Sequence, residues 1–153
     1  MVMDITWADT PISTTSTMDG NAITIPGAFT TLFATDVNGD LYGYTSTHLQ
    51  IHAPSEHHIE GDSFDVEFQI YHEMNPEFVA KAKTSRRKAV VSIMFNVDSS
   101  ASAHPLLEAL QVDNLGALDI ELASTLGSKL PSPVAYYTYE GSETYPPCEE
   151  TYN

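Results

Sequence analysis

The chain has 153 residues, 42% of them hydrophobic, which suffices for one globular domain with a buried core. It carries 21 acidic and 6 basic side chains, a formal net charge of −15, so its surface repels nucleic acid and anionic membranes. The sequence contains no run of about 20 apolar residues, and we expect neither a nucleic-acid partner nor a transmembrane span.

The first part of the chain has the pattern of short β-strands joined by polar turns. Residues 8–18 are rich in Ser and Thr and are expected to form a loop or an irregular edge strand. Strands are expected at 22–26, 28–34 and 41–45. The last two are separated by residues 36–40, where Asn-Gly favours the positive φ angles of a hairpin turn.

Two further strands, at 48–53 and 64–72, alternate polar and apolar side chains, so each has one polar and one apolar face. A polar link that contains Gly61 joins them, and an antiparallel pair is predicted. The polar face carries His48, Gln50 and His52 from the first strand and Asp65, Glu67, Gln69 and Tyr71 from the second.

The rest of the chain contains fewer regular elements. A buried strand is expected at 89–97, followed by a helix at about 103–112 with Ser102 as its N-cap. A weaker apolar pattern covers 117–126, and the end from Leu130, rich in Pro, Tyr and Gly, is expected to be loop and strand. The chain is therefore predicted to be mostly β with minor α.

The basic residues are concentrated in one segment. Five of the six fall within eight positions, and a solvated loop is the simpler interpretation of such a run. The alternative is a docking site for an acidic neighbouring protein. The five residues are Lys81, Lys83, Arg86, Arg87 and Lys88.

Imidazole and carboxamide groups on one strand face can mark a metal site, but their spacing here gives little support for one. His48 and His52 are four residues apart, about 13 Å at roughly 3.3 Å per residue, so they cannot share an ion. Gln50 has the spacing of a His-x-His pair with His52, but it is a glutamine.

Four blocks of the sequence, in order, resemble the α-type carbonic anhydrase family. MDGNAITI resembles an early family segment, and LQIHAPSEHHIEGDSFDVEFQIYHE resembles the zinc-ligand signature. AVVSIMFNVDSSASAHPLLEAL resembles the following strand and helix, and YYTYEGSETYPPCEE resembles the second signature. The resemblance covers about residues 18–150. It implies a central, largely antiparallel twisted sheet and a single partial domain over 1–153 that is truncated at both ends.

The resemblance also implies that the metal site has been lost. The family holds zinc with three histidines, whose positions fall on Gln50, His52 and Gln69. Carboxamide oxygens are weak zinc donors, so we expect no cofactor. His48 and Glu67 match positions that orient the ligands.

Other positions of the family's machinery are partly retained. Glu56 and Thr144 match its gate, in which a threonine donates to a buried glutamate, and we expect a buried pair. Glu143 replaces a leucine of the CO2 pocket, and a carboxylate there would spoil an apolar pocket. Asn21 replaces the proton-shuttle histidine and cannot carry a proton.

Three functions are compatible with these residues. The first is a catalytically inactive module that acts as a structural or accessory subunit, or as a binding domain, in a larger assembly. The second is a zinc carbonic anhydrase for reversible CO2 hydration with rearranged ligands, which requires donors such as His48, Glu67 and His72 to converge. The third is a module that binds a small polar molecule or anion in the old cavity, lined by Gln50, His52, Gln69 and Thr144.

Cys148 is the only cysteine and cannot close a disulfide within the chain. It matches a position that, in exported family members, pairs with a cysteine near the N-terminus; that partner would precede Met1. The resemblance therefore favours an extracellular, secretory or lumenal location over the cytosol.

Overall fold

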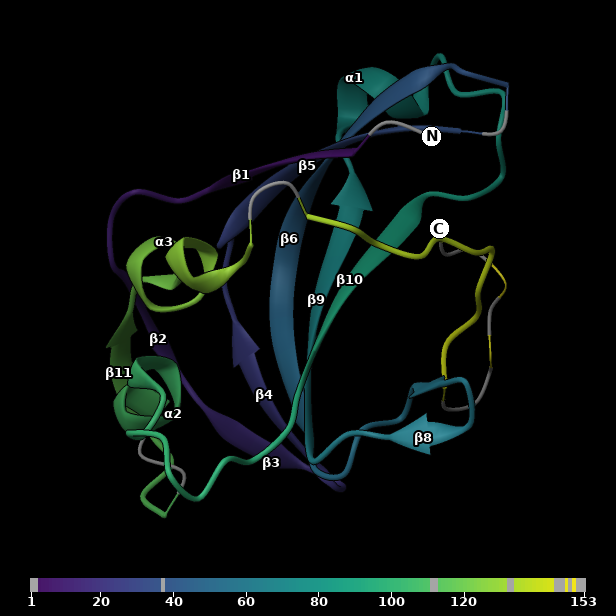
Figure 1. The fold of residues 1–153 in the computed structure, drawn as a ribbon. Helices are drawn as coiled ribbons and strands as arrows, with labels where there is room; N and C mark the ends of the chain where they lie inside the picture. The colour runs from purple at the N-terminus through teal and green to yellow at the C-terminus, as the bar shows by residue number, and fades with distance from the viewer. Residues whose placement is uncertain are drawn as a thin grey trace.

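The computed structural model describes residues 3–36, 38–110, 113–131, 134–144, 148 and 150. Within these ranges the chain forms a seven-stranded antiparallel sheet and two two-stranded sheets (Figure 1). The strands of the large sheet are β1 (Met3–Trp7), β3 (Thr17–Asp19), β4 (Ala22–Pro26), β5 (Thr30–Thr35), β6 (Leu41–His52), β9 (Val66–Met74) and β10 (Lys88–Phe95).

Strand β6 organises the large sheet. One of its edges pairs with β5 along the first half of the strand and with β4 along the second half, while its other edge pairs with β9. A register shift in the β6–β9 pairing lies between Ser46 and His48. The strands predicted at 41–45 and 48–53 are therefore two halves of one twelve-residue strand.

The apolar face of the sheet carries the main core. Ile25, Leu49 and Ile70, from three neighbouring strands, are each 0% exposed. The helices α2 (Pro105–Leu110) and α3 (Leu122–Thr125) pack on this core through leucines. Burying each such side chain contributes about 1.5–3 kcal/mol, so one apolar face suffices to fix the register of three strands.

The N-terminal part is more regular than its sequence indicates. β1 was not predicted, and the polar stretch 8–18 contains β2 (Ile12–Thr15) and the first two residues of β3. β2 pairs with β11 (Ala117–Ile120), about a hundred positions later in the chain. A local pattern cannot show that pairing, because the hydrogen-bond partner lies so far away in the sequence.

The predicted helix is present but begins later than expected, and its expected cap is wrong. It begins at Pro105, so His104 rather than Ser102 precedes it, and the Leu106 backbone N–H donates to the His104 ring at 3.3 Å. Residues 111 and 112 of the predicted helix lie outside the described residues. The weak apolar pattern at 117–126 divides into β11 and α3.

The remaining elements are short connections. A turn forms between β5 and β6, with Gly39 at a φ of 83° and the Asp36 carboxylate accepting the Asp40 N–H, but Asn38 does not have the expected positive φ. The chain also contains β7 (His58–Ile59), β8 (Asp62–Ser63), α1 (Pro76–Val79) and the 3-10 turn η1 (Gly127–Lys129). Among the described residues, no helix has the length and apolar character needed to cross a bilayer.

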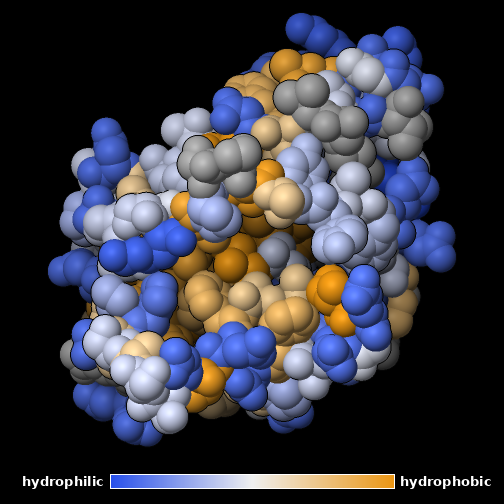
Figure 2. Space-filling model, in the orientation of Figure 1, coloured by the Kyte–Doolittle hydropathy of each residue, from blue (hydrophilic) through white to orange (hydrophobic). Residues whose placement is uncertain are grey.

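Strand β10 lies at an edge of the large sheet. In the described part of the chain it pairs with β9 alone. Val91, Ile93 and Phe95 contact the main core from this strand and remain only half-buried. Figure 2 shows hydrophobic residues gathered in a hollow at the centre of the view, within a largely hydrophilic surface.

Candidate functional site

The polar face shared by β6 and β9 is the candidate site. Antiparallel pairing brings side chains of one face directly opposite each other, about 4.5–5.5 Å apart at Cβ. Polar residues that the alternation assigned to one face therefore become neighbours. The opposed pairs are His48 with Tyr71, Gln50 with Gln69, and His52 with Glu67.

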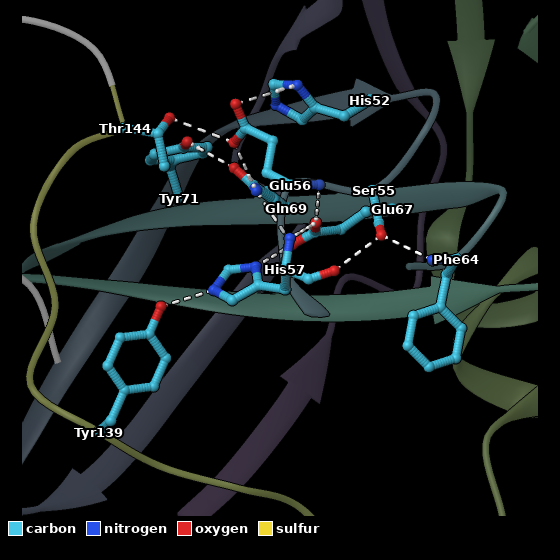
Figure 3. A network of polar contacts seen from close by, with 10 residues as sticks. All are labelled: His52, Ser55, Glu56, His57, Phe64, Glu67, Gln69, Tyr71, Tyr139 and Thr144. Atoms are coloured by element: carbon cyan, nitrogen blue, oxygen red, sulfur yellow. Dashed lines mark hydrogen bonds and ion pairs between the residues drawn. The ribbon is translucent and has the colours of Figure 1, made fainter. Parts of the chain in front are cut away.

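Gln69 lies at the centre of this face and is 1% exposed. Its amide nitrogen donates to the carboxylates of Glu56 and Glu67, at 3.0 Å in both cases (Figure 3). Its carbonyl oxygen accepts the Tyr71 hydroxyl at 2.7 Å. Both ends of the carboxamide are thus engaged by protein groups.

The other two predicted ligand positions are held less tightly. The Gln50 amide nitrogen donates to the Thr24 hydroxyl at 3.4 Å, a long hydrogen bond. His52 Nδ1 lies 3.8 Å from a Glu56 oxygen. His52 Nε2 is buried and has no hydrogen-bond partner among the described residues.

These residues do not fit a zinc ion. A catalytic zinc site needs three protein donors of the imidazole, thiolate or carboxylate type, and His52 is the one imidazole among the three positions. The donor atom of Gln69 already accepts a hydrogen bond from Tyr71. Within the described residues no group of three or more His, Cys, Asp and Glu side chains is placed to hold a metal.

Glu67 is 0% exposed and anchors a hydrogen-bonded row. Burial alone would raise its pKa, but hydrogen bonds from the His57 ring and backbone and from Gln69 outweigh burial and lower the pKa to about 2. The His57 ring lies 2.5 Å from this carboxylate, which raises the pKa of His57. The other ring nitrogen lies 2.5 Å from the Tyr139 hydroxyl. Glu67 therefore orients His57 as well as Gln69.

The gate pair is present, although it is not buried. The Thr144 hydroxyl donates to the Glu56 carboxylate at 3.1 Å. The Glu56 side chain is 33% exposed and Thr144 is exposed, so the expectation of a buried pair is wrong. Thr144 ends a segment without regular strands, residues 134–144, that lies at the surface; we call it the C-terminal strap.

Glu143 is paired rather than isolated. Its side chain is 8% exposed, and its carboxylate lies 3.2 Å from the Lys88 ammonium. A charged pair, and not an apolar wall, therefore occupies this side of the site. The attraction of the Lys88 ammonium offsets the free-energy cost of removing the Glu143 carboxylate from water, a cost that an unpaired carboxylate would bear in full.

His48 and Asn21 lie at the margins of the site. The His48 ring stacks on Tyr71 with 4.5 Å between ring centroids, and burial lowers the pKa of His48. His48 thus supports Tyr71 and not Gln50. Asn21 is exposed in the turn between β3 and β4, next to Ala22, which pairs with His52.

The basic segment contacts acidic or carbonyl groups of its own chain. Lys83 pairs with Asp40 at 2.9 Å, and Arg86 pairs with Glu140 at 2.9 Å. Lys88 holds Glu143, and the Arg87 guanidinium donates to the Thr84 carbonyl. Lys81 is exposed. The simpler interpretation, a solvated loop, describes Lys81 and Lys83 better than it describes Arg86 and Lys88.

Three residues that complete the site were not assigned a role in it from the sequence. Tyr71 holds the Gln69 oxygen, Lys88 neutralises Glu143, and Tyr139 contacts His57. The alternation of β9 placed Tyr71 on the polar face, which was the one available signal. Contacts of the other two depend on how the C-terminal strap folds back, and local sequence does not specify that path.

Comparison with known families decides the kinship. The profile of the eukaryotic-type carbonic anhydrases matches residues 6–153. The chain belongs to this family. Dioscorin dioA3 of Dioscorea japonica is 32% identical over 114 residues, which cover 70% of this chain and 37% of the relative. Alpha carbonic anhydrase 7 of Arabidopsis thaliana is 30% identical over 120 residues, covering 74% and 38%.

Solved structures of the family share the fold. A structure of dioscorin complexed with ascorbate superposes with a TM-score of 0.68 at 25% identity, covering 98% of this chain and 58% of that one. The Photobacterium profundum alpha-carbonic anhydrase gives a TM-score of 0.70 at 23% identity, covering 98% and 63%. The mostly β, largely antiparallel carbonic anhydrase fold is thereby confirmed. The chain spans less than two thirds of the length of these relatives.

Proposed function

We propose that this chain is a carbonic anhydrase-like module without a zinc centre, which acts as a structural, accessory or binding domain of a larger assembly. The observation that carries the proposal is the hydrogen bonding of the buried Gln69 side chain. Its carboxamide makes three hydrogen bonds, to Tyr71, Glu56 and Glu67. The Tyr71 bond already occupies one lone pair of the carboxamide oxygen, and this oxygen could offer a metal only a neutral, weak donor.

The chemistry of the family depends on the ion. Zinc lowers the pKa of a bound water to about 7 and so supplies hydroxide at neutral pH. Thr144 and Glu56 can orient an oxygen atom, but neither side chain can generate hydroxide. The Lys88–Glu143 pair adds charge where a CO2 pocket needs apolar surface. Both features support a module that is retained for its shape.

The edge of the sheet supports a role in an assembly. The outer side of β10 has no strand partner among the described residues, and the strand is uncharged from Ala89 to Phe95. Edges of this kind accept a further strand, and natural proteins cover or charge them when no partner is intended. A neighbouring protein that pairs with β10 would complete the sheet.

CO2 hydration measured by stopped flow tests the loss of catalysis. We expect the purified chain to leave the rate at its uncatalysed value, both with and without added zinc. A rate that rises with zinc and returns to the uncatalysed value with a chelator would contradict the proposal and favour a zinc enzyme with rearranged ligands.

Binding of a small polar ligand is the second candidate, and His52 favours it. Its Nε2 is buried without a partner among the described residues, and such an atom gains a hydrogen bond from a ligand hydroxyl. Dioscorin, the relative whose structure is 25% identical, was solved with ascorbate. Calorimetric titration with ascorbate should show saturable binding that His52→Ala abolishes and His58→Ala, at an exposed histidine, preserves. Absence of binding to the wild-type chain would exclude ascorbate.

A further inference from the structure

The C-terminal strap is attached to the rest of the molecule by polar contacts and buries little apolar surface. Its large side chains are largely exposed: Tyr137 is 82% exposed, Tyr139 62%, Val134 44% and Tyr136 41%. The strap contains one isolated bridge, at Gly141, and no strand. Burial of apolar surface, which holds the helices against the core, therefore contributes little to its docking.

Charge supplies an important part of the attachment. Arg86 and Lys88 enter from the basic segment, and they meet Glu140 at 2.9 Å and Glu143 at 3.2 Å. Arg86 also donates to the Gly141 carbonyl at 3.2 Å. In a chain of net charge −15, these two cations draw an acidic strap back onto an acidic body.

The docked strap completes the polar site. It brings the Thr144 hydroxyl to Glu56 and the Tyr139 hydroxyl to the His57 ring (Figure 3). Glu56 in turn accepts from Gln69 at the centre of the face. Release of the strap would thus remove one partner each from Glu56 and His57 and would open this side of the site to solvent.

We infer that the strap is an ionic latch, closed over the polar site by the Arg86–Glu140 and Lys88–Glu143 pairs and released when those pairs are screened or reversed. The Arg86–Glu140 pair, whose carboxylate is 58% exposed, weakens with salt, whereas the apolar core of the sheet does not. The Lys88–Glu143 pair, in which Glu143 is 8% exposed, is screened less by salt and is tested by charge reversal. The strap should consequently open while the sheet remains folded. This inference is independent of whether the site binds a ligand or has lost its metal.

Backbone dynamics of the strap give the direct test. The {1H}–15N NOE values of residues 134–144 should be close to those of the sheet at low salt. They should fall when ionic strength rises from about 0.01 M to about 1 M, as the screening length drops from roughly 30 Å to roughly 3 Å. Strap values that stay unchanged across this range would overturn the inference.

Charge reversal isolates the Lys88–Glu143 pair. Glu143→Lys places a second ammonium group next to that of Lys88, so the two repel each other. We expect chymotrypsin to cleave after the strap tyrosines about fivefold faster, because the cleavage rate follows the population of the open form. Lys88→Glu combined with Glu143→Lys restores the pair and should restore the wild-type rate. Lys83→Gln, which removes an ion pair outside the strap, is the matched control and should leave the rate unchanged.

The double variant also separates latching from misfolding. If Glu143→Lys merely damaged the fold, the reversed pair would not recover the wild-type cleavage rate. Equal cleavage rates of wild type and Glu143→Lys would show that the pair does not hold the strap, and the inference would fall.

Discussion

At the scale of single residues, the site is defined by what its carboxamides do. Gln69 occupies the centre of a face on which the family places a ligand. Its hydrogen bonds with Tyr71, Glu56 and Glu67 use both amide N–H donors and one of the two lone pairs of the carbonyl oxygen. A buried polar group with its hydrogen bonds made rigidifies a fold, whereas one that lacks partners destabilises it. The contacts that engage the Gln69 carboxamide thus keep the polar face ordered.

His72 makes the stability of the fold depend on pH. It is 1% exposed, its ring lies 2.7 Å from the Thr30 hydroxyl, and burial lowers its pKa to about 4. The unfolded imidazole takes up a proton near its ordinary pKa of 6.5, while the folded one does not. The contribution of His72 to the free energy of unfolding is therefore complete above pH 6.5 and is lost as the pH falls towards 4. The loss is about 3 kcal/mol at most.

Urea unfolding between pH 7 and pH 4 measures this dependence. His57, with its raised pKa, contributes in the opposite direction, so each variant is compared with wild type at every pH. His72→Gln should flatten the fall in the free energy of unfolding, and His58→Gln, at an exposed position, should not. A His72→Gln variant that loses stability as steeply as wild type would contradict this assignment.

At the scale of elements, β6 links the core to the site. Leu49 and Ile51 point into the core, while Gln50 and His52 point to the polar face. This division was predictable, because a strand alternates with period two and its apolar half must be buried. The union of two predicted strands into β6 was not, since the bulge near Thr47 interrupts the pattern without ending the strand.

Two leucines of β6 test whether burial in the core decides what a side chain contributes to stability. Leu49 is 0% exposed and Leu41 is 52% exposed. Leu49→Ala should lower the free energy of unfolding by about 2–5 kcal/mol, through lost transfer energy and the cavity left behind. Leu41→Ala should change it by no more than about 0.5 kcal/mol. Equal losses in denaturant titrations would show that the core is not where the structure places it.

At the scale of the whole molecule, the fold follows from the sequence more closely than the contacts between distant segments do. The polar face, the strand before the helix and the mostly β class came from alternation and from the family signatures. The pairing of β2 with β11 and the path of the C-terminal strap did not. The β2–β11 pairing joins residues about a hundred positions apart, and the path of the strap depends on ion pairs such as Arg86–Glu140. A local sequence pattern encodes neither.

The edge at β10 has a consequence for the isolated protein. If a neighbouring chain normally covers this edge, the purified chain should associate as its concentration rises. Sedimentation should then give a mass above 16.8 kDa that Ser92→Lys returns towards the monomer value, because a charge on an edge strand opposes pairing.

A matched control lies on the opposite edge of the sheet. Thr6→Lys places the same charge on β1 and should leave the association unchanged. A wild-type chain that stays monomeric at every concentration, or an equal effect of both variants, would argue against β10 as the covered edge.

The zinc content of the wild-type chain, after incubation with excess zinc and dialysis, tests the central claim most directly. Gln50→His combined with Gln69→His is measured beside it, since these two positions face each other across β6 and β9 with His52 as the third ligand. We predict a substoichiometric content in the wild type and about one zinc per chain in the double variant. One firmly held zinc per wild-type chain would contradict the account.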